Sequence, residues 1–516
     1  MVMLTRVSRT PQATQPVVDD GLRHGVRASM TPGYPKDSAE AHKDWWGRPM
    51  SLPIERPIAG RDRPWRLRVH SAGESMRTVI LLVGVASTVA CAAPPRAWDT
   101  ELASYIDTLP AIDSHAHPMA FVPEGAPPDT DFDALPLEGL PPFDVPLGLH
   151  GGSHAYLAAQ RSLYGVSESA GGPEEAKAFG EARARVVHER GDQFPTWALD
   201  QLHIDVMLAN RIAMGPGLEA PRFRWVAFAD PLMLPLDTSG EAERTPDTKA
   251  LYPLEAKLLQ RYLRDLGIAA MPPTLERYQQ DVVSATLERQ HAAGAAAIKF
   301  EAAYLRALDF DPADPTAAAA VYARYVDAGV PTPAEYKLLE DHLVRVIARE
   351  AGRLGMAVQI HSANGFGGAY SAAGAAPHLL ESLVNDPSLG GTRFVIVHGG
   401  WPLVDETMSL LAKANVFADI SLMDQVAGQQ DLSRTLRMWL TAWPEKVLFG
   451  TDAFDGGAQQ GWEQVAWVAS HNARRALGDA LAGMVRDDEA TLERAKELAR
   501  MVLRENAATA YRLGGR

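Results

Sequence analysis

The chain has 516 residues and a mass of 55.9 kDa, with 46% hydrophobic and 22% charged residues, a globular composition that excludes a wholly disordered or fibrous chain. The formal net charge is -14, so no nucleic-acid partner is expected, because phosphate contacts need a basic surface. The single cysteine, Cys91, excludes both an intramolecular disulfide and a zinc site built from four cysteines.

Residues 1–75 differ in composition from the rest of the chain. They hold 12 Lys or Arg against 8 Asp or Glu, together with eight prolines, and they show no clear apolar periodicity. We interpret them as a non-native extension upstream of a true start at Met76, or as a basic, proline-rich disordered arm. In either case we expect residues 1–75 to lie outside the folded domain.

A secretory signal is predicted at residues 76–90. Arg77 precedes an uncharged run of small and apolar residues, 78–90, which is too short to span a bilayer and has the length of a signal's apolar region. The following Ser87-Thr88-Val89-Ala90-Cys91 resembles a bacterial lipobox, with Cys91 as the lipidated residue. The alternative is a buried apolar segment with an incidental cysteine. The prediction is a lipid-anchored protein of the bacterial cell envelope. The Ala92 that follows favours the outer membrane, facing the periplasm, with no spanning helix.

The remaining sequence, 91–516, alternates between strand and helix patterns and forms the predicted catalytic domain. Long helical patterns cover 172–190, 254–267, 275–293, 333–354, 404–414, 432–443 and 489–503, and a further helix is expected before residue 394. A proline- and glycine-rich loop is predicted over about 118–153. Strands are predicted at 111–117, 203–208, 224–229, 295–301, 357–361, 394–398, 416–422 and 446–452.

Eight strands separated by helices predict a parallel sheet, either doubly wound or closed into a barrel. The count of eight favours a (β/α)8 TIM-like barrel with a long insertion after strand 1. No GxGxxG follows the first strand, and neither a P-loop nor a GxSxG elbow is present. The nucleotide-binding alternative therefore has no sequence fingerprint.

Metal-ligand residue types stand at the predicted ends of five strands. Since side chains alternate along a strand, His115 and His117 share one face, and Lys299 shares a face with Glu301. Taken singly, each residue is more simply explained as an ordinary hydrogen-bonded or ion-paired side chain. As a set they predict a divalent-metal site, and imidazole with carboxylate suits Zn²⁺ best. The six candidate ligands are His115, His117, Lys299, His361, His398 and Asp452.

The motifs DSHAHP (113–118), IKFEAAY (298–304), QIHS (359–362), VHGG (397–400) and FGTD (449–452) together resemble the amidohydrolase superfamily, in particular the amidohydrolase-related family. The resemblance covers about residue 100 to the C-terminus. It implies that His115, His117 and Asp452 hold a first metal ion and that His361 and His398 hold a second. In a one-metal enzyme the latter two would bind the first ion and polarise the substrate. It also implies that Lys299 can be carboxylated into a bridging carbamate.

Metal-assisted hydrolysis of an amide, ester or lactone in a small substrate is the expected reaction, with Asp452 transferring the proton and His398 or the metal stabilising the oxyanion. A non-oxidative decarboxylase or other lyase is the first alternative, and a non-catalytic envelope lipoprotein is the second. The sequence does not specify the substrate or the oligomeric state. Candidate substrate contacts lie in the loops after the strands: Tyr304, Arg306, Asn364 and Trp401.

Overall fold

The computed structural model describes residues 97–136, 146–150, 153–165, 173–245, 247–363, 365, 370–456 and 460–514. These residues belong to one compact unit, Ala90–Arg516. Cys91, the predicted signal and the predicted extension lie outside the described residues, so those three predictions stay open. Among the described residues, no helix is both long and apolar enough to cross a bilayer.

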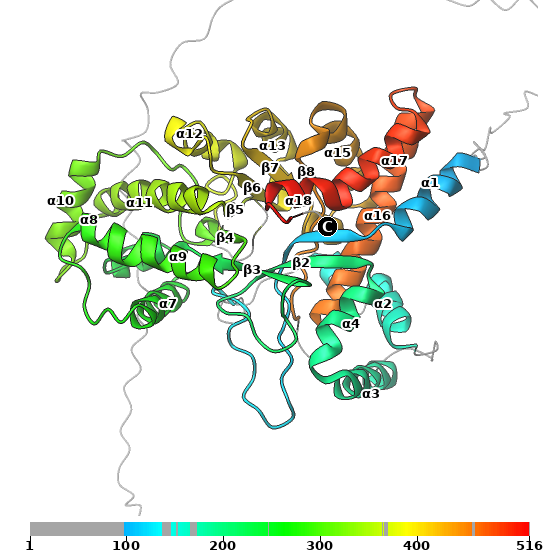
Figure 1. Cartoon of the computed structure of the whole chain (residues 1–516), viewed down its shortest axis with the longest axis horizontal. Coiled ribbons are helices and arrows are strands. Elements are labelled where there is room, and N and C mark those ends of the chain that lie inside the picture. The colour runs from blue at the N-terminus through cyan, green and yellow to red at the C-terminus, as the bar shows by residue number, and fades with distance from the viewer. Residues whose placement is uncertain are drawn as a thin grey trace, which may run out of the picture. The chain divides into compact units, whose positions relative to one another are not determined.

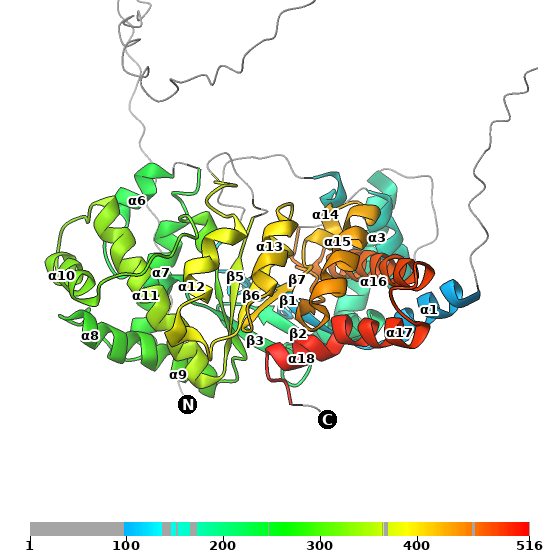
Figure 2. The same ribbon diagram turned by 90° about the horizontal axis from the view of Figure 1, so that it is seen from above.

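Eight parallel strands stand at the centre of the unit, in the order of the sequence, and helices surround them (Figures 1 and 2). The gap between β8 and β1 is bridged by hydrogen bonds from Ser114 N to Phe449 O and from Asp452 N to His115 O. The predicted (β/α)8 barrel is therefore confirmed. The strands are β1 Ala111–Ala116, β2 Ile204–Asn210, β3 Phe223–Phe228, β4 Ala297–Phe300, β5 Ala357–His361, β6 Phe394–Val397, β7 Val416–Asp419 and β8 Val447–Leu448.

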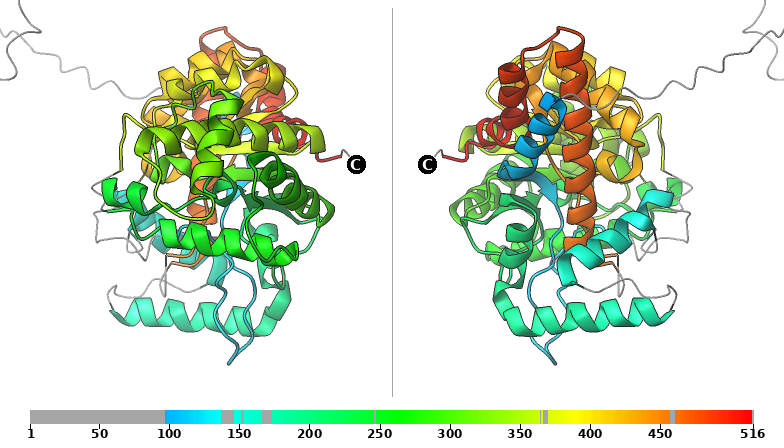
Figure 3. Two further views of the ribbon diagram at one scale, coloured as in Figure 1. Left: turned by 90° about the vertical axis from the view of Figure 1, so that its left-hand side faces the viewer. Right: turned by 90° about the vertical axis from the view of Figure 1, so that its right-hand side faces the viewer.

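The helices follow the strands along the chain and cover the outside of the barrel. Their bounds are α1 Ala97–Thr108, α2 His154–Tyr164, α3 Pro173–Arg190, α4 Phe194–Gln201, α5 Asp230–Met233, α6 Ser239–Arg244, α7 Tyr252–Asp265, α8 Leu275–Tyr278, α9 Ala285–Ala292, α10 Pro315–Tyr325, α11 Pro333–Leu354, α12 Glu381–Val384, α13 Val404–Leu411, α14 Met423–Val426, α15 Gln429–Ala442, α16 Trp462–Arg486, α17 Leu492–Arg500 and α18 Asn506–Ala510. The insertion after β1 carries α2, α3 and α4, and α1 and α16 lie side by side although they come from opposite ends of the domain (Figure 3).

Local sequence explains where the helix α11 begins and ends. Thr332 and Glu335 form a capping box in which each side chain accepts a hydrogen bond from the other's backbone N–H, and Pro333 occupies the first turn, where no N–H is needed. Gly355 ends the helix at φ 80°, a left-handed conformation that glycine adopts without steric cost. The helix predicted at 333–354 is thereby confirmed.

The helix predicted before β6 is present, but only as short helical pieces. Two short 3-10 turns, Pro377–Leu380 and Pro387–Leu389, flank the single-turn α12 in this segment. Each turn begins at a proline, which supplies no backbone N–H to a preceding helical turn. The predicted helix 275–293 is continuous, but its middle, Gln279–Ser284, is a π-helix.

The core is divided by the strands into an outer and an inner layer. The outer layer packs strands against helices, with residues such as Ile298, Phe300 and Ile360. The inner layer fills the amino-terminal half of the barrel, and Tyr511 from the C-terminal segment is part of it. Each strand contributes one residue to this layer, in strand order Ile112, Leu208, Val226, Ala297, Ala357, Val395, Phe417 and Leu448. Further along the strands the inward residues become polar, so the apolar layer forms the floor beneath a polar site.

Candidate metal centre

The six predicted ligands lie at or just beyond the carboxyl ends of five strands. His115 and Lys299 are within β1 and β4, and His361 is the last residue of β5. His398 directly follows β6, and Asp452 stands four residues beyond the end of β8. Because all strands are parallel, their carboxyl ends meet on one rim of the barrel and bring together residues far apart in sequence.

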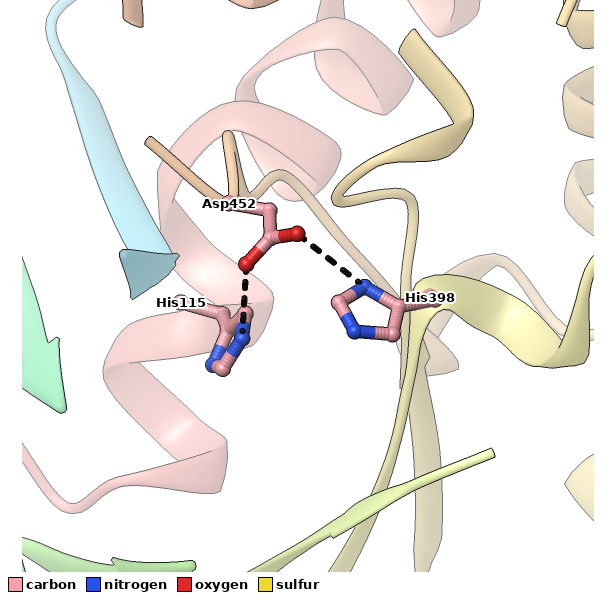
Figure 4. A group of neighbouring side chains, drawn as sticks. All are labelled: His115, His398 and Asp452. Carbon is pink, nitrogen blue, oxygen red and sulfur yellow. Dashed lines mark ion pairs between the residues drawn. The ribbon is translucent and has the colours of Figure 1, made fainter. Parts of the chain in front are cut away.

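Three of these residues form a compact group of potential metal donors (Figure 4). His115 Nε2 lies 3.1 Å from Asp452 Oδ1, and His398 Nδ1 lies 4.0 Å from Asp452 Oδ2. One donor atom from each residue falls within 4.8 Å of the other two. Both imidazoles are buried, while the Asp452 side chain keeps 13% of its surface exposed and can be reached from solvent.

The other three predicted ligands adjoin this group. His117 Nε2 lies 3.8 Å from Asp452 Oδ1, on the side of the carboxylate that faces β1. His361 Nδ1 lies 3.2 Å from His398 Nε2, and Lys299 Nζ lies 3.4 Å from His115 Nε2. The structure therefore brings all six residues into one cluster at the rim.

Two residues of the cluster adopt a backbone conformation that side chains rarely allow. His398 has φ 62° and Asp452 has φ 49°, in the left-handed region that costs non-glycine residues energy. Hydrogen bonds hold both in place, from His398 N to Asp419 Oδ1 and from Asp452 N to His115 O. Nearby, Gly450 is required by close approach, because a Cβ there would lie 2.8 Å from Ser114 Oγ.

Two buried amides act on the protonation of His115. Gln359 Nε2 donates to Ser114 O at 2.7 Å and to Tyr511 Oη at 2.9 Å, which turns Gln359 Oε1 towards His115 Nδ1 at 3.0 Å. This oxygen can only accept, which favours the tautomer with the proton on Nδ1 and the Nε2 lone pair facing the cluster. Asn210 Nδ2, a donor 2.9 Å from the same Nδ1, favours the opposite tautomer. Gln359 and Asn210 therefore compete for His115.

Two buried aspartates that the sequence did not assign hold the rim together. Asp113 accepts hydrogen bonds from the backbone N–H and hydroxyl of Thr451 and so ties β1 to the segment that carries Asp452. Asp419 accepts from Ser421 Oγ at 2.6 Å, and Ser421 Oγ in turn lies 3.0 Å from His398 Nδ1. Burial raises the pKa of Asp113 to about 7 and that of Asp419 to about 6, although their hydrogen bonds act in the opposite direction.

The donor set fits a divalent metal ion. Burial and the nearby Lys299 lower the pKa of His115 well below its ordinary value, and burial likewise lowers the pKa of His117 and His398. These imidazoles are consequently neutral at pH 7, which is the form that ligates metals. Neutral imidazole nitrogens together with a carboxylate oxygen are the donors that Zn²⁺ and related divalent ions bind.

The predicted substrate contacts have different surroundings. The Tyr304 ring lies 4.7 Å from that of His361 and 5.1 Å from that of Tyr370, beside a cleft of about 470 Å³ that both tyrosines line. Trp401 is partly buried and packs on the core. Asn364 lies outside the described residues.

Arg306 already has carboxylate partners within the protein. Its guanidinium lies 2.9 Å from Glu340 and 2.7 Å from Asp341, both on α11, and stacks over the Phe310 ring at 4.7 Å. It also lines the cleft beside Tyr304. Binding of a substrate carboxylate by Arg306 stays a prediction. In the structure, the Arg306 side chain joins the loop after β4 to α11.

The barrel and the cluster of candidate ligands at its rim are typical of the class of enzymes that have a divalent-metal site. A family model described as Amidohydrolase matches residues 242–513, more than half of the chain, and the chain belongs to this family within the amidohydrolase superfamily. No match to a curated protein was found.

Three solved structures have a similar fold. A provisionally assigned metal-dependent hydrolase from Lactobacillus casei is 16% identical, with a TM-score of 0.52 over 80% of this chain and 97% of that one. A glucuronate isomerase from Caulobacter crescentus is 15% identical, with a TM-score of 0.48 over 81% and 94% of the two chains. A uronate isomerase from Thermotoga maritima is 13% identical, with a TM-score of 0.47 over 80% and 97%. At these identities the similarity concerns the fold alone.

Proposed function

We propose that the protein is a metal-dependent hydrolase that cleaves a C–N or C–O bond, as in an amide, ester or lactone, of a small substrate. The observation that carries this proposal is the convergence of His115, His398 and Asp452 at the rim of an amidohydrolase barrel. Neutral imidazoles beside a solvent-accessible carboxylate are the groups that metal-assisted hydrolysis requires.

Zn²⁺ is the proposed ion. His115, His117 and Asp452 would hold it, and His361 with His398 would hold a second ion or, in a one-metal enzyme, contact the first ion and the substrate. Lys299 points its Nζ at His115 Nε2, 3.4 Å away. As an ammonium it would repel a second cation, whereas as a carbamate it would supply oxygen ligands.

A bound divalent ion supplies Lewis acidity, which activates water and polarises the scissile group. The chain supplies the proton transfers. Asp452 accepts a proton from the attacking water and passes it to the leaving group, and its partial exposure lets it meet both. His398, kept neutral by burial, would polarise the oxygen that gains negative charge through the ion that it holds.

A lyase, such as a non-oxidative decarboxylase, is the second candidate. It is favoured by the compactness of the His115, His398 and Asp452 group, which suffices for a single ion without Lys299. Hydrolysis remains our first choice because Lys299 is buried within the cluster, where a carbamate would complete a two-ion site.

Asp452→Asn tests the proposed mechanism. The amide keeps the shape and removes the proton acceptor, so turnover on an amide, ester or lactone found by screening should fall by about 10²-fold or more while metal content is retained. Asp431 is an exposed carboxylate on α15 and provides the matched control, because Asp431→Asn should leave turnover unchanged. Metal-loaded wild-type protein that releases CO2 from unsaturated or aromatic acids, yet hydrolyses nothing, would establish the lyase instead.

We also propose that lipid on Cys91 anchors the enzyme to the bacterial cell envelope, at the periplasm-facing leaflet of the outer membrane. The support is the order of Arg77, the apolar run 78–90 and Cys91 in the sequence. Expression from Met76 in a Gram-negative host with labelled fatty acid should give labelled, membrane-associated protein, and Cys91→Ser should abolish the label. Unlabelled wild-type protein in the soluble fraction would refute the anchor.

A further inference from the structure

A cleft of about 470 Å³ lies beside the candidate metal centre, at the rim where the strands end. Its walls come from α6, from residues 303–309 after β4, from residues 333–340 at the start of α11 and from residues 370–371 after β5. The volume falls within the range of about 300–1,000 Å³ that is usual for small-molecule sites. We call it the tyrosine cleft, because Tyr304 and Tyr370 line it on the side of the metal centre.

Two tyrosine rings connect the tyrosine cleft to the candidate metal centre. The centre of the Tyr304 ring lies 4.7 Å from that of His361, and the centre of the Tyr370 ring lies 6.2 Å from it. The two tyrosine rings are 5.1 Å apart and inclined at 56°, so together they form an aromatic corner. Gly365 allows this arrangement, because a Cβ there would overlap the Tyr370 ring. A group bound against the corner would therefore stand within one ring of His361.

The charged side chains that line the tyrosine cleft are paired within the protein. Each cation has a carboxylate partner: Arg244 pairs with Glu241, Arg306 with Glu340 and Asp341, and Lys337 with Asp311 and Asp341. The acids of the cleft are held in the same way, since Glu241, Asp309 and Glu340 each pair with one of these cations. A charged ligand would have to displace one of these partners. The cleft therefore suits an uncharged group, which its apolar residues would also accept: Ala303, Leu305, Ala307, Pro333 and Ala334.

The hydroxyl of Tyr370 has no partner within the described part of the chain. Tyr370 Oη is buried, yet no described residue forms a hydrogen bond with it. Glu241 Oε1 also lacks a hydrogen-bond partner there, but the other oxygen of that carboxylate is paired with Arg244. A buried hydroxyl without a partner is costly, and a ligand oxygen within reach would remove this cost. Because Tyr370 lines the tyrosine cleft, a ligand bound in the cleft is placed to supply that oxygen.

We propose that the tyrosine cleft binds an uncharged aromatic ring of the substrate, and that Tyr370 Oη forms a hydrogen bond with an oxygen beside this ring, while the scissile bond lies at the metal centre. This inference rests on the proposed function and adds the substrate class to it, an amide, ester or lactone that carries an aryl group. Aromatic rings attract one another edge to face or in offset stacks, and an aromatic corner offers both contacts. Arg306, held by its two carboxylates, forms part of the wall.

Ligand-observed NMR titration of the full chain with benzyl alcohol tests the proposal, in the metal-loaded and in the metal-free form. We expect benzyl alcohol to bind to both forms. Cyclohexylmethanol, with the same hydroxyl on a saturated ring, and the anion benzoate should bind at least about threefold more weakly. Ala334→Trp, at the exposed start of α11, places a large side chain at the cleft and should weaken benzyl alcohol binding by about tenfold or more. Ala320→Trp, at an exposed position of α10 that does not line the cleft, is the matched control.

A separate comparison tests the hydroxyl of Tyr370. Tyr370→Phe keeps the ring and should weaken benzyl alcohol binding by about threefold to tenfold, the usual effect of one hydrogen bond, while toluene should bind equally to the variant and the wild type. Tyr325→Phe removes a hydroxyl that donates to Glu335 outside the cleft, so it should change the binding of neither ligand. Equal weakening of toluene and benzyl alcohol in Tyr370→Phe would refute the hydrogen bond.

Unchanged benzyl alcohol binding in Ala334→Trp, or equal binding of cyclohexylmethanol and benzyl alcohol, would overturn the proposal. Benzoate that binds more tightly than benzyl alcohol would overturn it in favour of a substrate carboxylate at Arg306. Because binding is measured without turnover, the two proposals can fail separately. Benzyl alcohol that binds through the cleft of a protein that hydrolyses nothing would refute the proposed function alone.

Discussion

Replacing Gln359 by leucine should weaken metal binding without replacing any ligand. In the wild type, Gln359 Oε1 accepts from His115 Nδ1 at 3.0 Å and keeps the Nε2 lone pair available. Leucine removes this acceptor and leaves Asn210 Nδ2, a donor 2.9 Å from the same nitrogen. The imidazole then accepts at Nδ1 and carries its proton on Nε2, which is the wrong tautomer for a metal. Loss of such a supporting hydrogen bond typically lowers metal affinity 10- to 100-fold, or about 1.4–2.7 kcal/mol.

Competition with a chromophoric chelator measures this affinity directly. Gln359→Glu should retain much of it, because a carboxylate still accepts from Nδ1, and Asn210→Leu should retain it fully, because the competing donor is gone. Gln279→Leu is the matched control: Gln279 lies 2.6 Å from His342 Nε2, a glutamine–histidine contact outside the site. A metal affinity within about threefold of the wild type in Gln359→Leu would refute the proposed control of the tautomer.

Three further predictions concern charge in the site and around it. In metal-free protein the lowered pKa of His398 keeps it neutral when folded, while the unfolded chain binds a proton below pH ~6.5; its contribution to stability is therefore lost as the pH falls, by about 1.4 kcal/mol per pH unit. Urea denaturation at pH 7 and pH 5.5 should show a smaller loss in His398→Gln than in the wild type, because the lowered pKa values of His115 and His117 still act in the same direction in the variant. Arg306→Met should destabilise the fold by about 3–5 kcal/mol, because Glu340 and its neighbour lose their buried partner, whereas the exposed Arg324→Met should change little. Lys299→Ala should lower a two-ion content towards one, with partial recovery on adding short carboxylic acids; a wild-type content of one, with metal and activity unaffected by the substitution, would favour the lyase.

The barrel and its polar rim were predictable because both follow from local patterns. In β4, Ala297 faces the inner layer while Ile298 and Phe300 face the helices, as the alternation in the sequence indicated. The same alternation put Lys299 inside the barrel. Parallel strands then bring their ends to one rim, so the six candidate ligands could be grouped without knowing any distance.

The groups that support the ligands could not be found in this way. Gln359 and His115 are 244 residues apart, and an inward-facing glutamine has no local signal that names its partner. Asp113 stood within a recognised motif, but its bond to Thr451 depends on how the barrel closes. Glu255 has the sequence context of a surface acid on an amphipathic helix, yet it is buried in the structure, where α7 packs against α5.

The central claim is that the rim cluster around His115, His398 and Asp452 binds a catalytic metal ion. Anomalous diffraction from crystals of protein loaded with Zn²⁺ tests it most directly. We expect a strong peak bonded to nitrogen of His115 and to a carboxylate oxygen of Asp452 at about 2.0–2.2 Å. Metal-replete crystals with no anomalous peak between these three side chains would contradict the claim.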